Sequence, residues 1–152
     1  DAGLYVDKTF VLSPLPRTAP AAVDLAKELV LSLGAKPVFL DPERHDRLVA
    51  AISHLPYLLA VTLVRAAESL GQDDPLIWRL AAGGFRDTSR VAAGDLTMML
   101  DILTTNREPI LEALREAQAQ LARLAEALEE QDFAALQAML EAARRRRVEV
   151  YP

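Results

Sequence analysis

The sequence predicts a mainly α-helical protein with a small strand-containing segment at its start, and three observations support this fold class. The 152 residues are 51% hydrophobic but only 5% aromatic, so the core is built from aliphatic residues, among which Ala and Leu favour helices. From Asp41 onward no strand pattern appears until the last few residues, whereas two short apolar runs of strand length precede Asp41. We therefore expect two domains, residues 1–41 and residues 42–152.

The first segment has the pattern of a βαβ unit. Thr9–Leu12 is β-branched and aromatic and is ended by the prolines of Ser13–Pro16, which predicts a strand. Thr18–Leu33 has apolar residues at helical spacing, and Gly34 follows as a stop signal. Lys36–Leu40 is a second strand. Two parallel strands make an incomplete sheet, so we expect further strands to lie beside them.

The second segment begins with a strong helix signal. Asp41 is a favourable N-cap and Pro42 stands at the first helical position, so a helix is predicted to run to about Gly71. Pro56 has no N–H to donate inside this helix. We therefore expect the helix to bend or break beside His54, which creates a pocket wall.

Further helices follow along the chain. They are expected from Leu76 to Ala82, where Gly83 and Gly84 end the helix, from Phe85 to Ala93, after Asp95, and after Asp132. Six apolar residues then recur at alternating spacings of four and three: Ile110, Leu114, Ala117, Leu121, Leu124 and Leu128. This heptad seam on a helix from Arg107 to Glu130 predicts a homodimer. The run Arg144–Arg147 suits a solvated helix end and is given no role.

Composition excludes several classes of function. The chain has 22 acidic and 17 basic residues and a net charge of −5, without a repeated basic face, so we expect no nucleic-acid partner. The absence of cysteine removes thiolate chemistry and favours a reducing compartment, which we take to be the cytoplasm. The uncharged stretch Leu48–Val64 is interrupted by polar residues and short for a membrane span, so we expect a buried helix and no membrane. The sequence starts at Asp1, without an initiating methionine or a secretory signal, so we expect this end to result from truncation of a longer chain.

Cofactor and metal signatures are absent from the sequence. The six glycines form neither G-x-G-x-x-G nor a phosphate-binding loop, so we expect no cofactor to bind this chain alone. His45 and His54 match no zinc-ligand spacing, so we expect no metal.

Two polar clusters remain as candidate sites. Ser53–Tyr57 interrupts the most apolar stretch, either as a core histidine with satisfied hydrogen bonds or as part of a pocket. Gly83–Arg90 places Arg86 and Arg90 four residues apart near a helix start, which is typical of an anion site. The alternative is an exposed pair between Asp87 and Arg90.

Several motifs together resemble the C-terminal half of prephenate/arogenate dehydrogenases. The similarity covers nearly the whole chain. The matching segments are Phe10–Pro14, Asp41–Asp46, Ile52–Pro56 with the sequence ISHLP, Ala82–Ala92 with the sequence AGGFRDTSRVA, Asp95, Asp101–Leu103 and Asn106–Arg107.

This resemblance implies a fold and an activity. The fold would be an all-helical dimerisation and substrate domain of the 6-phosphogluconate dehydrogenase C-terminal type, preceded by a short βαβ remnant of a Rossmann domain. The full-length enzyme would convert prephenate to 4-hydroxyphenylpyruvate by NAD- or NADP-dependent oxidative decarboxylation, in tyrosine biosynthesis. The fragment alone is expected to be inactive.

The resemblance also implies roles for individual residues. Arg90 matches the arginine that holds a substrate carboxylate, and His54 matches the histidine of the kinked pocket helix. The full set of implied substrate-binding residues is Arg90, His54, Asp87, Tyr57 and Gly83. The catalytic histidine is expected upstream of Asp1. Two positions depart from the family: Tyr57 stands where many relatives have a second histidine, and Met99 where many have a tryptophan.

Two alternative functions stay open. One is a non-enzymatic helical dimerisation or interaction domain, for which an arginine aimed into a cavity near His54 would have no purpose. The other is a different dehydrogenase with a similar helical C-terminal domain. The residues do not distinguish prephenate from arogenate or NAD from NADP.

Overall fold

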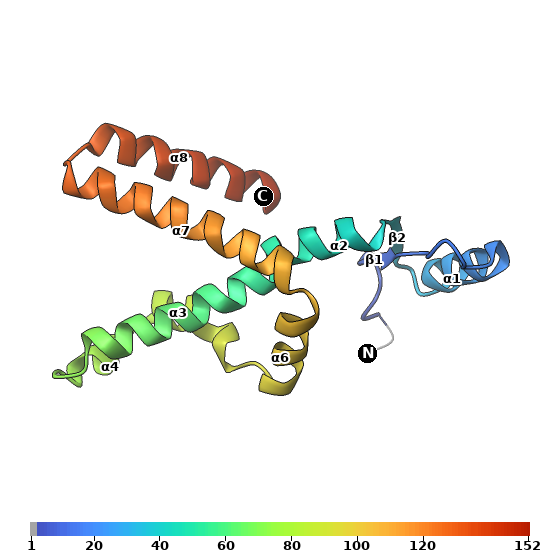
Figure 1. Cartoon of the computed structure of the whole chain (residues 1–152), viewed down its shortest axis with the longest axis horizontal. Coiled ribbons are helices and arrows are strands. Elements are labelled where there is room, and N and C mark those ends of the chain that lie inside the picture. The colour runs from blue at the N-terminus through green and yellow to red at the C-terminus, as the bar shows by residue number, and fades with distance from the viewer. Residues whose placement is uncertain (1–2) are drawn as a thin grey trace. The chain divides into compact units, whose positions relative to one another are not determined.

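A computed structural model describes residues 3–152 (Figure 1). It is mainly helical, as expected, and divides into two compact units, Asp1–Ile110 and Leu111–Pro152. The elements are β1 (Thr9–Leu12), α1 (Pro20–Ser32), β2 (Lys36–Phe39), α2 (Pro42–Val49), η1 (Ala50–His54), α3 (Leu55–Leu70), α4 (Leu76–Leu80), α5 (Gly83–Ser89), η2 (Arg90–Ala93), α6 (Leu96–Thr105), α7 (Arg107–Glu129) and α8 (Phe133–Val150).

The predicted βαβ unit is present. β1 and β2 pair in parallel, with Thr9 opposite Lys36 and Leu12 opposite Phe39. α1 ends where Gly34 adopts a left-handed φ of 72°. The Gly34 N–H donates to the Leu31 carbonyl at 2.9 Å, and the N–H of the next residue donates to the Val30 carbonyl at 3.1 Å. This pair of bonds closes the helix end, which explains why a glycine follows it.

The small sheet leaves apolar side chains uncovered. Leu25 and Leu29 on α1 are 68% and 60% exposed, and Phe39 on β2 is 45% exposed. Such a surface agrees with a sheet that continues beyond two strands. The compact units separate after Ile110, which is a different division from the expected domain boundary at residue 41. That boundary stays a prediction.

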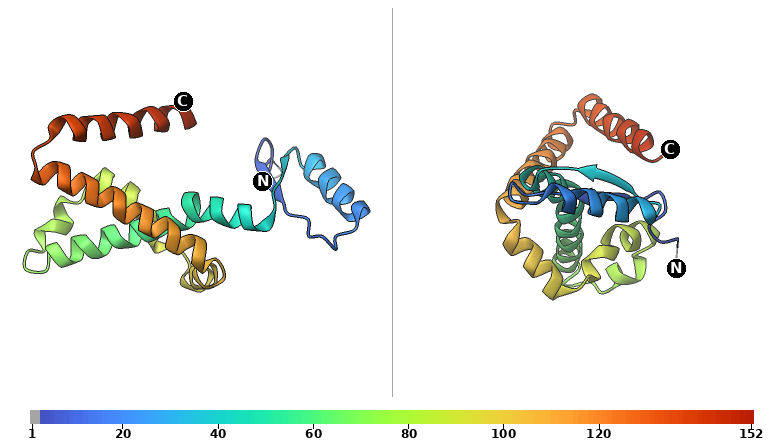
Figure 2. Two further views of the ribbon diagram at one scale, coloured as in Figure 1. Left: turned by 45° about the horizontal axis from the view of Figure 1, so that its top comes forward. Right: turned by 90° about the vertical axis from the view of Figure 1, so that its right-hand side faces the viewer.

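The long helix begins as the sequence predicts, and beside His54 it changes to a π-helical turn where a bend or break was expected. The Asp41 carboxylate accepts a hydrogen bond from the Arg44 N–H at 2.8 Å, and Pro42 is the first helical residue. The interruption is the π-helical turn η1, in which the N–H of Leu55 donates to the carbonyl of Ala50. Pro56 lies directly after this turn, in the first turn of α3, so the run from α2 to α3 continues without a break in the chain of helices (Figure 2).

Within the described residues, the run Pro42–Leu70 is the one helix whose length and composition would let it cross a membrane, and core helices of water-soluble proteins pass the same test. α3 packs against α5 and η2, so this run takes part in the fold of its unit. The expectation of no membrane stays a prediction.

One helix boundary was predicted wrongly. Gly83 and Gly84 were expected to end the preceding helix, but they are the first two residues of α5. Ala82 is extended, with φ −111° and ψ −163°, and acts as the N-cap. Glycine is compatible with either helix end, and only the surrounding packing decides between them. α5 then passes into the 3₁₀ turn η2, which ends at Ala93 and is followed by Gly94, as predicted.

The last helices are capped by the expected residues. The Asp95 carboxylate accepts from the Met98 N–H at 2.8 Å, and the Asp132 carboxylate accepts from the Ala135 N–H at 2.9 Å. The second unit contains most of α7 and all of α8, which run in opposite directions from a short turn (Figure 1). Local side-chain caps therefore place these helix starts where the sequence indicates.

Candidate functional site

A cavity of about 730 Å³ lies within the first unit. Its walls come from η1 and the start of α3, from η2 and the residue after it, and from α6. The lining residues are Ile52, Ser53, His54, Pro56, Tyr57, Arg90, Val91, Ala93, Gly94, Met98, Met99 and Ile102. The π-turn beside Pro56 thus forms part of a cavity wall.

Three of the predicted site residues lie on this cavity and two do not. His54, Tyr57 and Arg90 line it together, although the sequence separates Arg90 from the other two. Gly83 and Asp87 are exposed residues of α5 outside the lining. That any of these five residues binds substrate stays a prediction.

Arg90 carries a free positive charge at the cavity. It is an exposed residue, and within residues 3–152 its guanidinium has neither an ion-pair nor a hydrogen-bond partner. Asp87, the expected alternative partner, instead accepts from Nε of Arg86 at 3.1 Å. Both members of that pair are largely exposed, so it contributes little to stability. Arg90 is therefore available to an anion.

Only one of the two arginines of the expected anion site lines the cavity. Arg86 lies outside the cavity lining, whereas Arg90 lies on it. Arg86 belongs to α5, which ends at Ser89, whereas Arg90 is the first residue of the 3₁₀ turn η2.

His54 is buried and has a partner that sequence reasoning missed. It is 9% exposed, and its Nδ1 lies 3.2 Å from Nδ2 of Asn106, which is itself 8% exposed. Nδ2 of Asn106 also donates to the backbone carbonyl of Asp46 at 2.9 Å. Asn106 lies in the motif that carries the family resemblance, but its 52-residue separation from His54 gave no sign of a contact. One ring nitrogen of the buried His54 thus has a hydrogen-bond partner from a distant part of the sequence.

Burial lowers the pKa of His54 from its ordinary value of 6.5. The nearby Asp46 carboxylate opposes this shift and His45 adds to it. Because the net pKa shift is downward, the folded structure favours the neutral form of the His54 imidazole.

The two residues that depart from the family both help to shape the cavity. Tyr57 is 8% exposed and Met99 is 7% exposed. Gly94 lies close to the tyrosine ring, since a Cβ at that glycine would be 3.7 Å from Cε2 of Tyr57. The cavity therefore combines one free cation, a neutral imidazole and a phenol with apolar walls. This chemistry suits a small molecule with a carboxylate and a ring.

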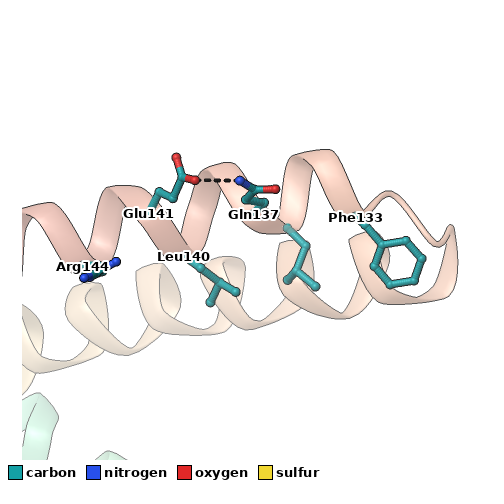
Figure 3. A pocket seen from close by; sticks show the side chains of 6 residues that line it. Phe133, Gln137, Leu140, Glu141 and Arg144 are labelled. Carbon is teal, nitrogen blue, oxygen red and sulfur yellow. Dashed lines mark hydrogen bonds between the residues drawn. The ribbon is translucent and has the colours of Figure 1, made fainter.

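Other hollows are poorer candidates. One of about 330 Å³ lies along α8, beside Phe133, Leu140 and Arg144 (Figure 3). All of its lining residues come from that single helix, so it is a groove on an exposed face. Within the described residues, no three His, Asp or Glu side chains converge to hold a metal ion.

Sequence comparison identifies relatives of this chain. Residues 41–142 match the family described as "Prephenate dehydrogenase, dimerization domain". The prephenate dehydrogenase of Bacillus subtilis is 33% identical over 129 residues, which are 85% of this chain and 35% of that protein. The cyclohexadienyl dehydrogenase of Zymomonas mobilis is 31% identical over 136 residues, which are 87% of this chain and 46% of that protein.

Solved structures agree with the sequence comparison. The arogenate dehydrogenase of Synechocystis matches with a TM-score of 0.87 and 30% identity, over 97% of this chain and 54% of the other. The prephenate dehydrogenase of A. aeolicus, in complex with hydroxyphenyl propionate and NAD+, matches with a TM-score of 0.92 and 27% identity, over 97% of this chain and 52% of the other. The chain thus spans about a third to a half of the length of these relatives. It belongs to the prephenate dehydrogenase family, in the part of that family described as the dimerization domain.

Proposed function

We propose that this chain is the substrate-binding C-terminal part of a prephenate or arogenate dehydrogenase. The reaction would be the NAD- or NADP-dependent oxidative decarboxylation of prephenate to 4-hydroxyphenylpyruvate, or the corresponding reaction of arogenate. The observation that carries the proposal is the unpaired Arg90 on a cavity shared with His54 and Tyr57, in a chain of this family. Arogenate, prephenate and cyclohexadienyl dehydrogenases all occur among the relatives, so both substrates remain candidates.

The residues of this chain would bind and orient the substrate. The Arg90 guanidinium offers a planar, permanently charged fork that matches a carboxylate. Neutral His54 and Tyr57 offer hydrogen bonds, and Met99 offers apolar contact to a ring. Asp87 and Gly83 would act only if α5 contacts the substrate from outside this cavity. The catalytic histidine is expected in a part of the enzyme that precedes this chain.

We expect no dinucleotide site within the described residues. Pyrophosphate binding in a Rossmann fold uses a glycine turn between a strand and a helix N-terminus. Here the connection from β1 to α1 contains no glycine. It does contain Pro14 and Pro16, which have no backbone N–H to donate to a phosphate. We therefore expect NAD or NADP to be bound by another part of the full-length enzyme, and this chain alone to bind neither.

The proposal includes a homodimer formed through the helical part. The matched family is described as a dimerization domain. In the second unit, large apolar side chains stay exposed in the single chain: Leu121 55%, Leu128 57%, Phe133 65% and Leu140 58%. We expect a second copy of the chain to bury this apolar surface, because symmetric homodimers are the commonest assemblies. We expect a cytoplasmic location and no nucleic-acid or membrane partner.

The test of substrate binding is Arg90→Ala in the full-length enzyme. Loss of a charge-assisted, bidentate contact costs about 2–4 kcal/mol, so KM for the preferred substrate should rise roughly thirty- to a thousandfold. The melting temperature should stay near that of the wild type, because Arg90 is exposed and unpaired in the described residues. The assay compares prephenate with arogenate and NAD with NADP.

Arg86→Ala is the matched control. It removes an arginine from the neighbouring helix turn, outside the cavity, and should leave KM unchanged. Unchanged kinetics in Arg90→Ala would contradict the proposed site. Absence of dehydrogenase activity in the wild-type enzyme with both substrates would instead favour the non-enzymatic interaction domain or a different dehydrogenase.

A further inference from the structure

The contact between Asn106 and His54 determines where the imidazole carries its proton. The starting point is the Asp46 backbone carbonyl, which can only accept a hydrogen bond. The Asn106 atom that lies 2.9 Å from this oxygen must therefore be the amide nitrogen Nδ2 and not the amide oxygen. The hydrogen-bond network thus fixes the orientation of the Asn106 amide.

The orientation of Asn106 decides the protonation of the neighbouring ring nitrogen. Nδ2 of Asn106 carries two hydrogens, one of which goes to the Asp46 carbonyl. The second is available to His54 Nδ1, at an N···N distance of 3.2 Å. An amide nitrogen does not accept hydrogen bonds, so Nδ1 of His54 must be the acceptor. The neutral ring then carries its proton on Nε2.

The other ring nitrogen is accessible. Within residues 3–152, Nε2 of His54 has no hydrogen-bond partner, and no side-chain nitrogen or oxygen is both fully buried and unpaired. His54 is 9% exposed and lines the cavity that Arg90 also lines. Nε2 is therefore the ring atom left to a ligand in that cavity.

We propose that Asn106 is a positioning residue that holds neutral His54 in the Nε2–H tautomer, so that the imidazole presents a hydrogen-bond donor to a ligand oxygen. In this state His54 cannot act as a base through Nε2. It would donate to a carboxylate or hydroxyl oxygen of the substrate, beside the positive charge of Arg90. The substrate role rests on the proposed function, whereas the tautomer does not.

The ionisable surroundings of His54 are consistent with a neutral ring. His45 and Asp46 come from α2, Tyr57 from α3 and Arg90 from η2, while α6 and the residue after it contribute the uncharged Asn106. Burial lowers the pKa of His54 and so favours the neutral ring. Only the neutral ring has two tautomers, with the proton on Nδ1 or on Nε2.

Nitrogen-15 NMR of the histidine rings tests the tautomer directly, without substrate. The chain contains two histidines, so His45→Gln assigns the signals of His54. In the wild-type chain at pH 7.5, Nδ1 of His54 should have the chemical shift of an unprotonated ring nitrogen and Nε2 that of a protonated one. A protonated Nδ1 would overturn the proposal, even if every variant failed to fold.

Two variants extend the test. Asn106→Asp replaces the donor by an acceptor of the same shape, so the proton of His54 should move to Nδ1. The control is Thr105→Ala, because the Thr105 hydroxyl bonds only to carbonyls of its own helix. Its His54 signals should match those of the wild type. A wild-type tautomer in Asn106→Asp would contradict the proposed role of Asn106.

Kinetics of the full-length enzyme test the consequence for substrate. Asn106→Ala should raise KM up to about tenfold, as expected when one neutral hydrogen bond is weakened, and Thr105→Ala should not. A lower melting temperature in Asn106→Ala with unchanged KM would mean that Asn106 is only structural. A further outcome is that Arg90→Ala leaves the kinetics unchanged while the NMR spectra show the predicted tautomer. That outcome would reject the proposed function and leave the tautomer assignment intact.

Discussion

The cavity in the first unit and the exposed face of α8 differ in which side chains are buried. At the cavity, the polar His54 and Asn106 are buried and hydrogen-bonded to each other. On α8, the apolar Phe133 and Leu140 face solvent, and the polar pair nearby, Gln137 and Glu141, is exposed (Figure 3). The buried polar side chains beside the cavity thus find partners within the chain, whereas the apolar side chains of the α8 face stay uncovered in the single chain. This is the difference expected between the proposed ligand site and the proposed association surface.

The largest expected effect concerns association. Leu121→Asp puts a charge into the heptad seam of α7, and burying an unpaired charge at an interface costs several kcal/mol. Dimer dissociation should therefore become at least about a hundredfold easier, as measured by sedimentation or light scattering across protein concentrations.

The control for the seam is Ala122→Asp, which adds the same charge one residue away, at an exposed position outside the seam. The dimer should persist in that variant. A wild-type chain that stays monomeric at micromolar concentration would contradict the proposed homodimer.

The next effect compares two neighbouring methionines at the cavity. Met99 is 7% exposed and Met98 is 53% exposed, both on α6. Met99→Ala should lower the free energy of unfolding by about 2–4 kcal/mol, because it removes packed methylene groups and leaves a void. Met98→Ala should cost less than about 1 kcal/mol. Chemical denaturation of both variants measures the difference, and equal losses would mean that the buried wall is not closely packed.

The smallest effect is the pH dependence due to His54. Its pKa is lowered by burial in the folded chain, so the unfolded chain binds the proton more readily as pH falls below 6.5. At higher pH, His54 should not affect the free energy of unfolding. This free energy should fall as the pH drops below 6.5, and the fall should end once the pH is below the pKa of His54 in the folded chain. His54→Gln should reduce this dependence, and His45→Gln should largely retain it. Denaturation series between pH 5 and 7.5 compare the slopes.

The parts of the fold that could be predicted from the sequence are those set by local chemistry. Asp41, Asp95 and Asp132 cap helices through hydrogen bonds to residues three positions on, which a sequence pattern contains in full. The glycines Gly83 and Gly84 were assigned to the wrong helix because glycine suits both helix ends.

The candidate site could be predicted only in part, because it depends on contacts between distant segments. His54 and Arg90 were found from their motifs, but their shared cavity depends on how η1, η2 and α6 pack. The bond from Asn106 to His54 crosses 52 residues and has no local signature. The residue spacing also does not show that Arg90 lines the cavity while Arg86 does not.

The most direct test of the central claim is a crystal structure of the full-length enzyme with hydroxyphenyl propionate, the compound bound in the A. aeolicus relative. The account predicts that the carboxylate of this compound lies within hydrogen-bond distance of the Arg90 guanidinium, in the cavity that His54 and Tyr57 line. A carboxylate bound elsewhere, with Arg90 still free of any ligand, would contradict it.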